Sequence, residues 1–183
     1  MPSLPSAPPP ARTRRTRRTR GSLQQRLLSG LAPGLVAGVA GTAAMTASTA
    51  LEKRLRPELD HPVDYDASSH VADAVGVVLR HDAETDAGRL AYFLLAHWGY
   101  GPAVALAHPW LADRLGEPRA TLAFYAGSQV MAMTLFPTIG GTPAPWRWER
   151  DVLATSFGQH AVYALSVSLT GRLLRSRRCR RPR

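Results

Sequence analysis

The residues that could carry chemistry in this chain are a few polar side chains inside long uncharged runs. The candidate functional residues are two histidines, two glutamines and two tyrosines: His97, Tyr100, Gln129, Gln159, His160 and Tyr163. A further histidine, His108, lies in the same run as His97. Histidine titrates near neutral pH, and ionisable groups at membrane depth often mark a pathway for protons or solutes. These side chains are therefore where a function of the uncharged runs would reside.

His97 and His160 are expected at similar depths, because each lies about 12 to 14 Å along a helix from the charged residue before it, Arg89 or Asp151. Three interpretations of the pair are open. In the first, the two histidines and Gln129 form hydrogen bonds between helices, each worth about 0.6 to 2 kcal/mol. In the second, they line a pathway for protons or a small solute. In the third, the two imidazoles ligate a haem from both sides.

No motif for a chemical reaction is found. The sequence contains no HExxH, no GxSxG and no glycine-rich loop followed by lysine, and no carboxylate lies inside an uncharged run. The single cysteine, Cys179, allows neither an internal disulfide nor a thiolate metal site. We therefore expect no enzymatic activity, no catalytic residues, no metal site and, unless haem is bound, no cofactor.

Four runs without Asp, Glu, Lys or Arg must position these side chains. They predict membrane spans at about 27–51, 90–112, 120–140 and 152–171, because about 20 helical residues cross roughly 30 Å of hydrocarbon. The expected fold class is all-α: an integral membrane four-helix bundle over residues 27–171, with a short interfacial helix and disordered basic termini.

The first span has a face of small residues. Gly30, Gly34, Gly38, Thr42 and Thr46 follow one another at intervals of four, the GxxxG pattern that lets helices approach closely in lipid. The partner is another span of this chain or a second copy in a homo-oligomer. The same segment also meets the description of a secretory signal.

Charge is sorted along the chain. All 13 acidic residues fall between Glu52 and Asp151, and the charged residues of the segments before and after are all arginines. Basic flanks stay in the cytoplasm, so we expect a multi-pass protein of the cytoplasmic (inner) membrane with both termini inside and the acidic loop 52–89 outside.

The extramembrane segments predict the partners. The arm 1–26 and the tail 172–183 have a basic composition typical of disorder, and anionic lipid head groups attract such residues by about 1 kcal/mol each. A nucleic-acid partner is disfavoured, since no aromatic residue lies between the arginines to stack on a base. Within the outer loop, the apolar spacing predicts an amphipathic helix at about 69–80, carried by Val71, Ala74, Val75, Val78 and Leu79.

The sequence resembles a group of bacterial four-helix inner-membrane proteins similar to the YagU-like family, which is linked to acid resistance. The resemblance is carried by GLVAGVAGTAAMTA (34–47), AHWGYG (96–101), FPTIGGTPAPW (136–146) and GQHAVYA (158–164). It implies location and architecture, and it supplies no substrate and no catalytic residue.

The expected function is that of a non-enzymatic inner-membrane protein with a structural or stress-related role. Two alternatives stay open. One is a small transporter or proton-conducting module that uses His97, His160 and Gln129. The other is a basic nucleic-acid-binding protein, which would require the uncharged runs to form a soluble core.

Overall fold

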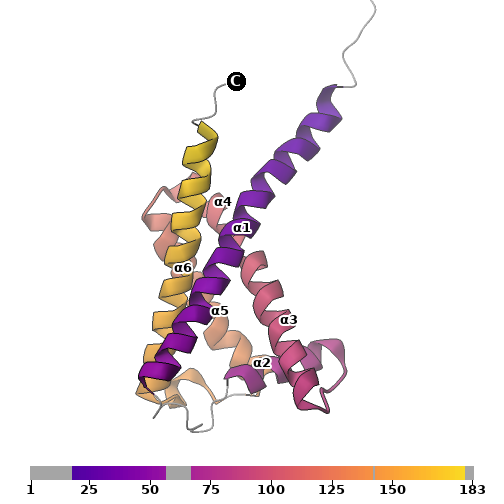
Figure 1. Ribbon diagram of the computed structural model, residues 1–183, viewed down its shortest axis with the longest axis vertical. Helices are drawn as coiled ribbons and strands as arrows, with labels where there is room; N and C mark the ends of the chain where they lie inside the picture. The colour runs from indigo at the N-terminus through magenta and orange to yellow at the C-terminus, as the bar shows by residue number, and fades with distance from the viewer. Residues whose placement is uncertain (1–17, 57–66, 142, 180–183) are drawn as a thin grey trace, which may run out of the picture.

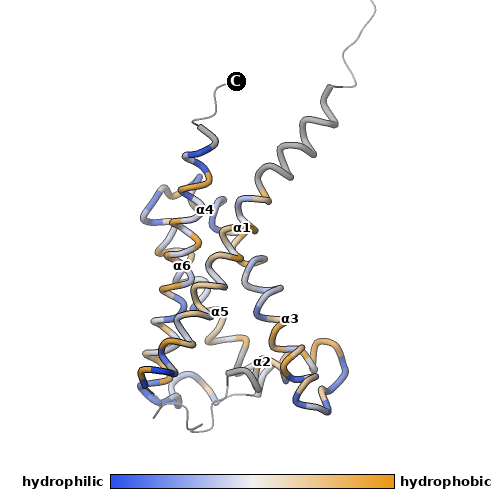
Figure 2. Tube along the Cα trace, viewed as in Figure 1, coloured by the Kyte–Doolittle hydropathy of each residue, from blue (hydrophilic) through white to orange (hydrophobic). Residues whose placement is uncertain are grey.

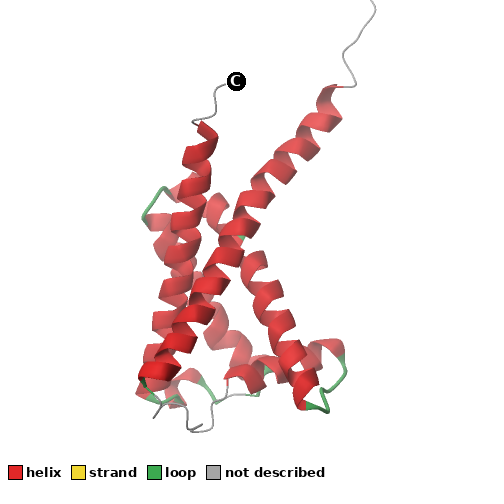
Figure 3. Ribbon diagram, in the orientation of Figure 1, coloured by secondary structure: helices red, strands yellow, loops and turns green. Residues whose placement is uncertain are grey.

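The computed structural model describes residues 18–56, 67–141 and 143–179, and the regular elements in these ranges are all helices (Figure 3). The all-α prediction is confirmed for this part of the chain. The elements in chain order are α1 (Arg18–Leu55), α2 (Ala67–Leu79), α3 (Asp86–Ala105), α4 (Ala107–Leu115), α5 (Arg119–Ile139), the short 3-10 helix η2 (Pro145–Arg147) and α6 (Arg150–Cys179).

The long helices lie side by side and alternate in direction (Figure 1). The start of α1 and the end of α6 lie at the same end of the molecule, while α2 lies beside the start of α3 at the opposite end. α1 packs against both α6 and α3, and α5 packs against α4 and α6. The buried core lies between them and comprises Ala37, Ala105, Phe124, Tyr163, Ala164 and Val167.

Three helical segments are long and apolar enough to cross a membrane: Leu31–Glu52 in α1, Asp86–Leu115 through α3 and α4, and Arg119–Ile139 in α5. Many of their large apolar side chains point outward, including Val36, Leu95, Leu122 and Val130, and the apolar colouring in Figure 2 runs along these helices. Such surfaces are unfavourable in water and favourable in lipid. The chain thus has the character of a membrane protein. α6 is not among the three, because serine, threonine, glutamine, histidine and arginine interrupt its apolar residues.

Both ends of the described chain differ from the predicted basic arms. α1 already begins at Arg18 and α6 continues to Cys179, so residues 18–26 and 172–179 are helical, which corrects the prediction of disorder there. Leucine, glutamine and arginine, which favour helix, make up most of both extensions, and neither extension contains proline. Residues 1–17 and 180–183 lie outside the described residues.

The second uncharged run forms two helices, although one was predicted. α3 ends at Ala105, and α4 starts at Ala107 after a tight turn in which the Leu106 amide donates to the Ala103 carbonyl at 3.2 Å. The cause is Pro109, which has no N–H to donate to the Ala105 carbonyl four residues earlier and whose ring crowds it. In the outer loop, α2 covers 67–79, close to the predicted helix at about 69–80.

The small-residue face of α1 lies against α3 and α4. A Cβ atom on Gly38 would come within 2.5 Å of the Pro102 Cα atom, and one on Gly34 within 3.0 Å of the Leu106 side chain. Farther along, Gly101 of α3 leaves room for the buried Thr42 side chain. The surroundings of Gly30 lie outside what the structure describes. The backbones of α1 and α3 can approach this closely only because these positions have no Cβ atom.

Replacing Gly38 with alanine should lower the free energy of unfolding by about 1 to 3 kcal/mol, the usual cost of overpacking. The matched control is Gly127→Ala, where nothing lies within 4 Å of the added Cβ atom. That variant should be neutral or gain up to about 1 kcal/mol of helix propensity. Denaturant unfolding in detergent micelles measures both, and equal losses in the two variants would contradict the α1–α3 packing.

Candidate functional site

α6 supplies several of the polar side chains that meet other helices. Residues four apart on a helix share one face, and two adjacent faces of α6 consist of such rows. The first row is Thr155, Gln159, Tyr163, Val167, Gly171 and Arg175, and the second is Ser156, His160, Ala164 and Ser168. Their contacts form three groups along the helix.

The first group lies near the start of α6 and surrounds the Glu52 carboxylate of α1. Thr155 Oγ1 donates to Glu52 Oε1 at 2.6 Å, and Gln159 Nε2 donates to Glu52 Oε2 at 3.1 Å. The Arg56 guanidinium lies 3.8 Å from Glu52 Oε1 and 3.6 Å from Asp151 Oδ1. Glu52 was assigned to the outer loop from the sequence, but α1 continues past it and turns it toward α6.

The second group lies in the middle of the bundle and contains two of the predicted candidates, Gln129 and His160. Gln129 Nε2 of α5 donates to Ser156 Oγ at 3.1 Å, and His160 Nδ1 donates to the Ser156 carbonyl at 2.8 Å. Ser156 therefore links Gln129 with His160. The Gln129 Oε1 atom is buried without a hydrogen-bond partner.

On the other side of α1, His97 of α3 lies 3.0 Å from Thr46 Oγ1 through its Nε2 atom. The Thr46 hydroxyl donates its one proton to the Thr42 carbonyl at 2.9 Å, so His97 Nε2 carries a proton and donates to Thr46. Tyr163 OH donates to the Gly101 carbonyl at 2.5 Å and so joins α6 to α3. Tyr100 is exposed.

The structure thus does not bring His97 and His160 together. Among the described residues no hydrogen bond or ring contact joins them, and each donates a ring proton to another partner. This arrangement favours the interpretation that they pack the bundle over the interpretation that they share a haem. In the same part of the chain, no group of three His, Cys, Asp or Glu side chains is placed to hold a metal ion.

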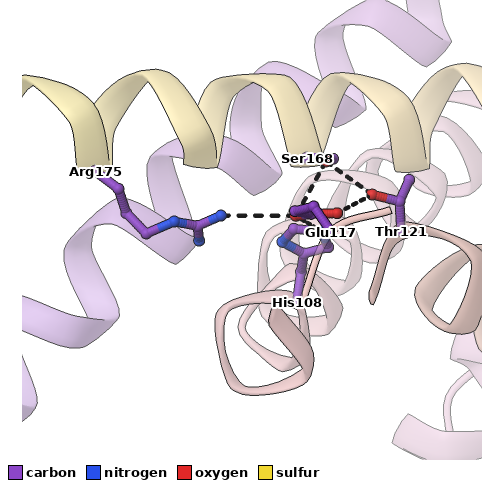
Figure 4. A network of polar contacts seen from close by, with 5 residues as sticks. All are labelled: His108, Glu117, Thr121, Ser168 and Arg175. Carbon is purple, nitrogen blue, oxygen red and sulfur yellow. Dashed lines mark hydrogen bonds and ion pairs between the residues drawn. The ribbon is translucent and has the colours of Figure 1, made fainter. Parts of the chain in front are cut away.

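The third group lies at the opposite end of the bundle (Figure 4). It was not predicted from the sequence. Its centre is the Glu117 carboxylate, in the turn between α4 and α5. Thr121 Oγ1 lies 2.5 Å from Glu117 Oε2, and Ser168 Oγ lies 3.3 Å from Glu117 Oε1. Two nitrogen atoms face the same Oε1 atom: His108 Nε2 at 3.2 Å and Arg175 Nη2 at 3.6 Å. Glu117 therefore connects α4, α5 and α6 at one point.

His108 is the most enclosed member of this group, with 1% of the residue exposed. The Phe124 ring packs edge-on against the imidazole, with centroids 5.4 Å apart. The His108 Nε2 atom is close enough to Glu117 for a hydrogen bond, but the angle between the two groups is unsuitable. Within the described part of the chain, this buried nitrogen therefore has no hydrogen-bond partner. The contact between the two is therefore electrostatic.

Glu117 is held in its ionised form. Burial of the carboxyl by itself would raise its pKa, but the Thr121 hydroxyl, the nearby imidazole of His108, the Ser168 hydroxyl and the Arg175 guanidinium together lower it below the ordinary value. Hydrogen bonds and positive charges favour the charged form of an acid. A carboxylate with these neighbours is a structural anchor at neutral pH.

Two spacings in the sequence indicate this group. Thr121 follows Glu117 by one helical turn, and Ser168 and Arg175 lie two turns apart on one face of their helix. Glu117 was not among the functional residues predicted from the sequence. A count of charges does not show which carboxylate becomes enclosed, and the Glu117 side chain is only 18% exposed.

The depressed pKa of Glu117 predicts a dependence of stability on pH. A carboxyl whose folded pKa lies below its unfolded value stabilises the fold above the unfolded pKa, and that contribution disappears as pH falls through the folded pKa. The ordinary pKa of a glutamate carboxyl is 4.5, so the loss should occur below that pH. Unfolding free energies of wild type and Glu117→Gln, measured from neutral pH to well below that value, should converge as the pH falls. A constant difference would contradict the assignment.

Comparison of the chain with family models, with curated proteins and with solved structures finds no match. The resemblance to the YagU-like proteins stays a prediction, and the function has to be argued from the geometry.

Proposed function

We propose that the chain is a four-span, non-enzymatic protein of the cytoplasmic membrane with a structural role, in which the polar side chains hold the helices together. The observation that carries the proposal is the distribution of polarity around α6. Its polar rows face α1, α3 and α5, where Glu52, Gly101, Gln129 and Glu117 are their partners. The resemblance to the YagU-like proteins would add a stress-related role.

The opposite face of α6 supports its role as the fourth span. That face carries Phe157, Leu165, Leu169 and Leu173, which are 40 to 60% exposed. At 1.5 Å per residue the 30 residues of α6 extend about 45 Å, more than the hydrocarbon needs. α6 thus presents apolar side chains outward and polar ones inward, the pattern expected of a span whose polar groups are satisfied by other helices.

The ends of the bundle support the orientation. Trp110 lies at one end under the Arg114 guanidinium, 4.2 Å from the ring centroid, and Trp146 is 83% exposed between α5 and α6 at the other. Tryptophan prefers the two membrane interfaces. The start of α1 and the end of α6 both lie at the Trp110 end (Figure 1). We assign this end to the cytoplasm, where its arginines would contact anionic lipid head groups.

The contacts of the buried polar residues favour packing over transport. Gln129, His97 and His160 each form a hydrogen bond within the protein, to Ser156 or Thr46. A proton or solute pathway through the three would need them to be linked, and α1 lies between the helices of the two histidines. The nucleic-acid interpretation has no comparable support, since it requires the outward apolar faces to be in water.

Reporter fusions should place residues Glu84 and Trp146 outside the cell and residue Arg177 inside. The fusions after Trp146 and Arg177 test α6 directly, because only α6 lies between them. If α6 does not cross the membrane, the two reporters will report the same side and the four-span proposal fails. A fusion after Glu84 on the cytoplasmic side would instead overturn the orientation.

Changing His97 to alanine removes a hydrogen bond between α3 and α1 and should lower the stability of the purified bundle by about 0.6 to 2 kcal/mol, the range for hydrogen bonds between membrane helices. Changing His160 to alanine removes a hydrogen bond within α6 and should also lower the stability. Proton flux into proteoliposomes should not differ among wild type, either variant and protein-free vesicles. If the wild-type protein conducts protons and both substitutions reduce that flux, the packing role is wrong and the transport alternative is supported.

A further inference from the structure

The contacts around Glu117 leave two nitrogenous side chains facing one carboxylate oxygen. His108 Nε2 lies 3.2 Å and Arg175 Nη2 lies 3.6 Å from the same Oε1 atom (Figure 4). The second oxygen, Oε2, is engaged by Thr121 at 2.5 Å. Arg175 and His108 therefore share one acceptor, and a change in the charge of one alters how strongly the other is held.

The charge of the imidazole decides this balance. With a neutral His108, Arg175 is the only cation on Oε1, and the ion pair ties the end of α6 to the α4–α5 turn. A protonated His108 would be attracted to the same oxygen at shorter range and would repel the guanidinium. Arg175 can leave, because its side chain is 38% exposed, whereas His108 is fixed in the core with its side chain 1% exposed.

We propose that His108 and Glu117 form a proton-binding site, and that binding of a proton there releases Arg175 and with it the end of α6. The ligand is the proton itself, taken up by the His108 imidazole. The inference goes beyond the proposed structural role and does not depend on the number of spans, because it rests only on how α4, α5 and α6 meet.

No other charged side chain is shown to contact this site in the described part of the chain. The other charged residues of α4 are Asp113 and Arg114, which are exposed, and Arg114 lies over Trp110. On α5 the nearest is the exposed Arg119, and on α6 it is the exposed Arg172. The part of α1 that packs near α4, around Gly34, has no titratable residue. Gly171 faces both the His108 ring and the Arg175 guanidinium, and a Cβ atom there would lie in ordinary contact with both.

A nitroxide label near the end of α6 tests the proposal. The label is placed at Ser176→Cys, an exposed position one residue after Arg175, in a Cys179→Ser background. Its mobility is measured by electron paramagnetic resonance in proteoliposomes from about pH 8 to about pH 5, the range in which histidine titrates. The parent label should become more mobile as pH falls, in a transition that fits one proton.

Two variants should abolish this transition, one by keeping the label immobile and the other by keeping it mobile at every pH. In His108→Gln no proton can bind and Arg175 stays on Glu117, so the label should be immobile throughout. In Glu117→Gln the ion pair is absent, so the label should be mobile throughout. The Glu117→Gln amide has nearly the same shape as the carboxylate; its oxygen accepts from one hydroxyl and its NH2 group donates to the other. This variant therefore tests the proposal even if His108→Gln fails to fold. His160→Gln, which changes a histidine on α6 outside this site, is the control and should retain the transition.

Three results would overturn the proposal. A parent label with no pH transition would show that the Glu117 group is a static clamp. A transition that persists in folded His108→Gln would assign the proton to another residue. A transition of parental size and midpoint in Glu117→Gln would show that the carboxylate takes no part.

Discussion

The arrangement of this molecule depends on one requirement: the polar side chains of α6 must find partners inside the bundle. Leaving a donor or acceptor unpaired in apolar surroundings costs about 1 to 3 kcal/mol, and α6 carries such groups along most of its length. Three helices meet this requirement. α1 contributes Glu52, α3 the Gly101 carbonyl, and α5 Gln129, while Glu117 in the turn before α5 accepts from Ser168. The order of the helices around α6 follows from these pairings.

A second constraint fixes how close the helices lie. Gly38 brings α1 against Pro102, and Gly41, three residues later, faces Tyr163 and Val167 of α6. α1 thus has small residues on two of its faces and fits between α3 and α6. The close approach and the polar pairing support each other, because Tyr163 reaches the Gly101 carbonyl only when the three helices are this close.

The sequence predicts elements better than partners. Uncharged runs locate α1, α3, α5 and α6, since a membrane helix is specified by its own composition. The glycine spacing in α1 predicts a face for close packing, and the structure places Gly34 and Gly38 against α3 and α4. The break between α3 and α4 before Pro109 was not predicted. His97 and His160 were considered as a pair, but no described contact joins them. Glu117 was missed because its partners come from three elements, and only the packing brings them together.

The position of α1 between α3 and α6 also has a consequence for biosynthesis. α1 has extensive contacts with α6, which follows it far along the chain, so a large part of its packing surface has no partner until α6 has been translated. Contacts between distant parts of a chain form late and slowly. Until then, the glycine face of α1 can pair with α3 but its other face stays uncovered. A chain truncated before α6 would therefore remain an open assembly, in which Glu52 keeps only Arg56 among its described partners and Gln129 loses Ser156.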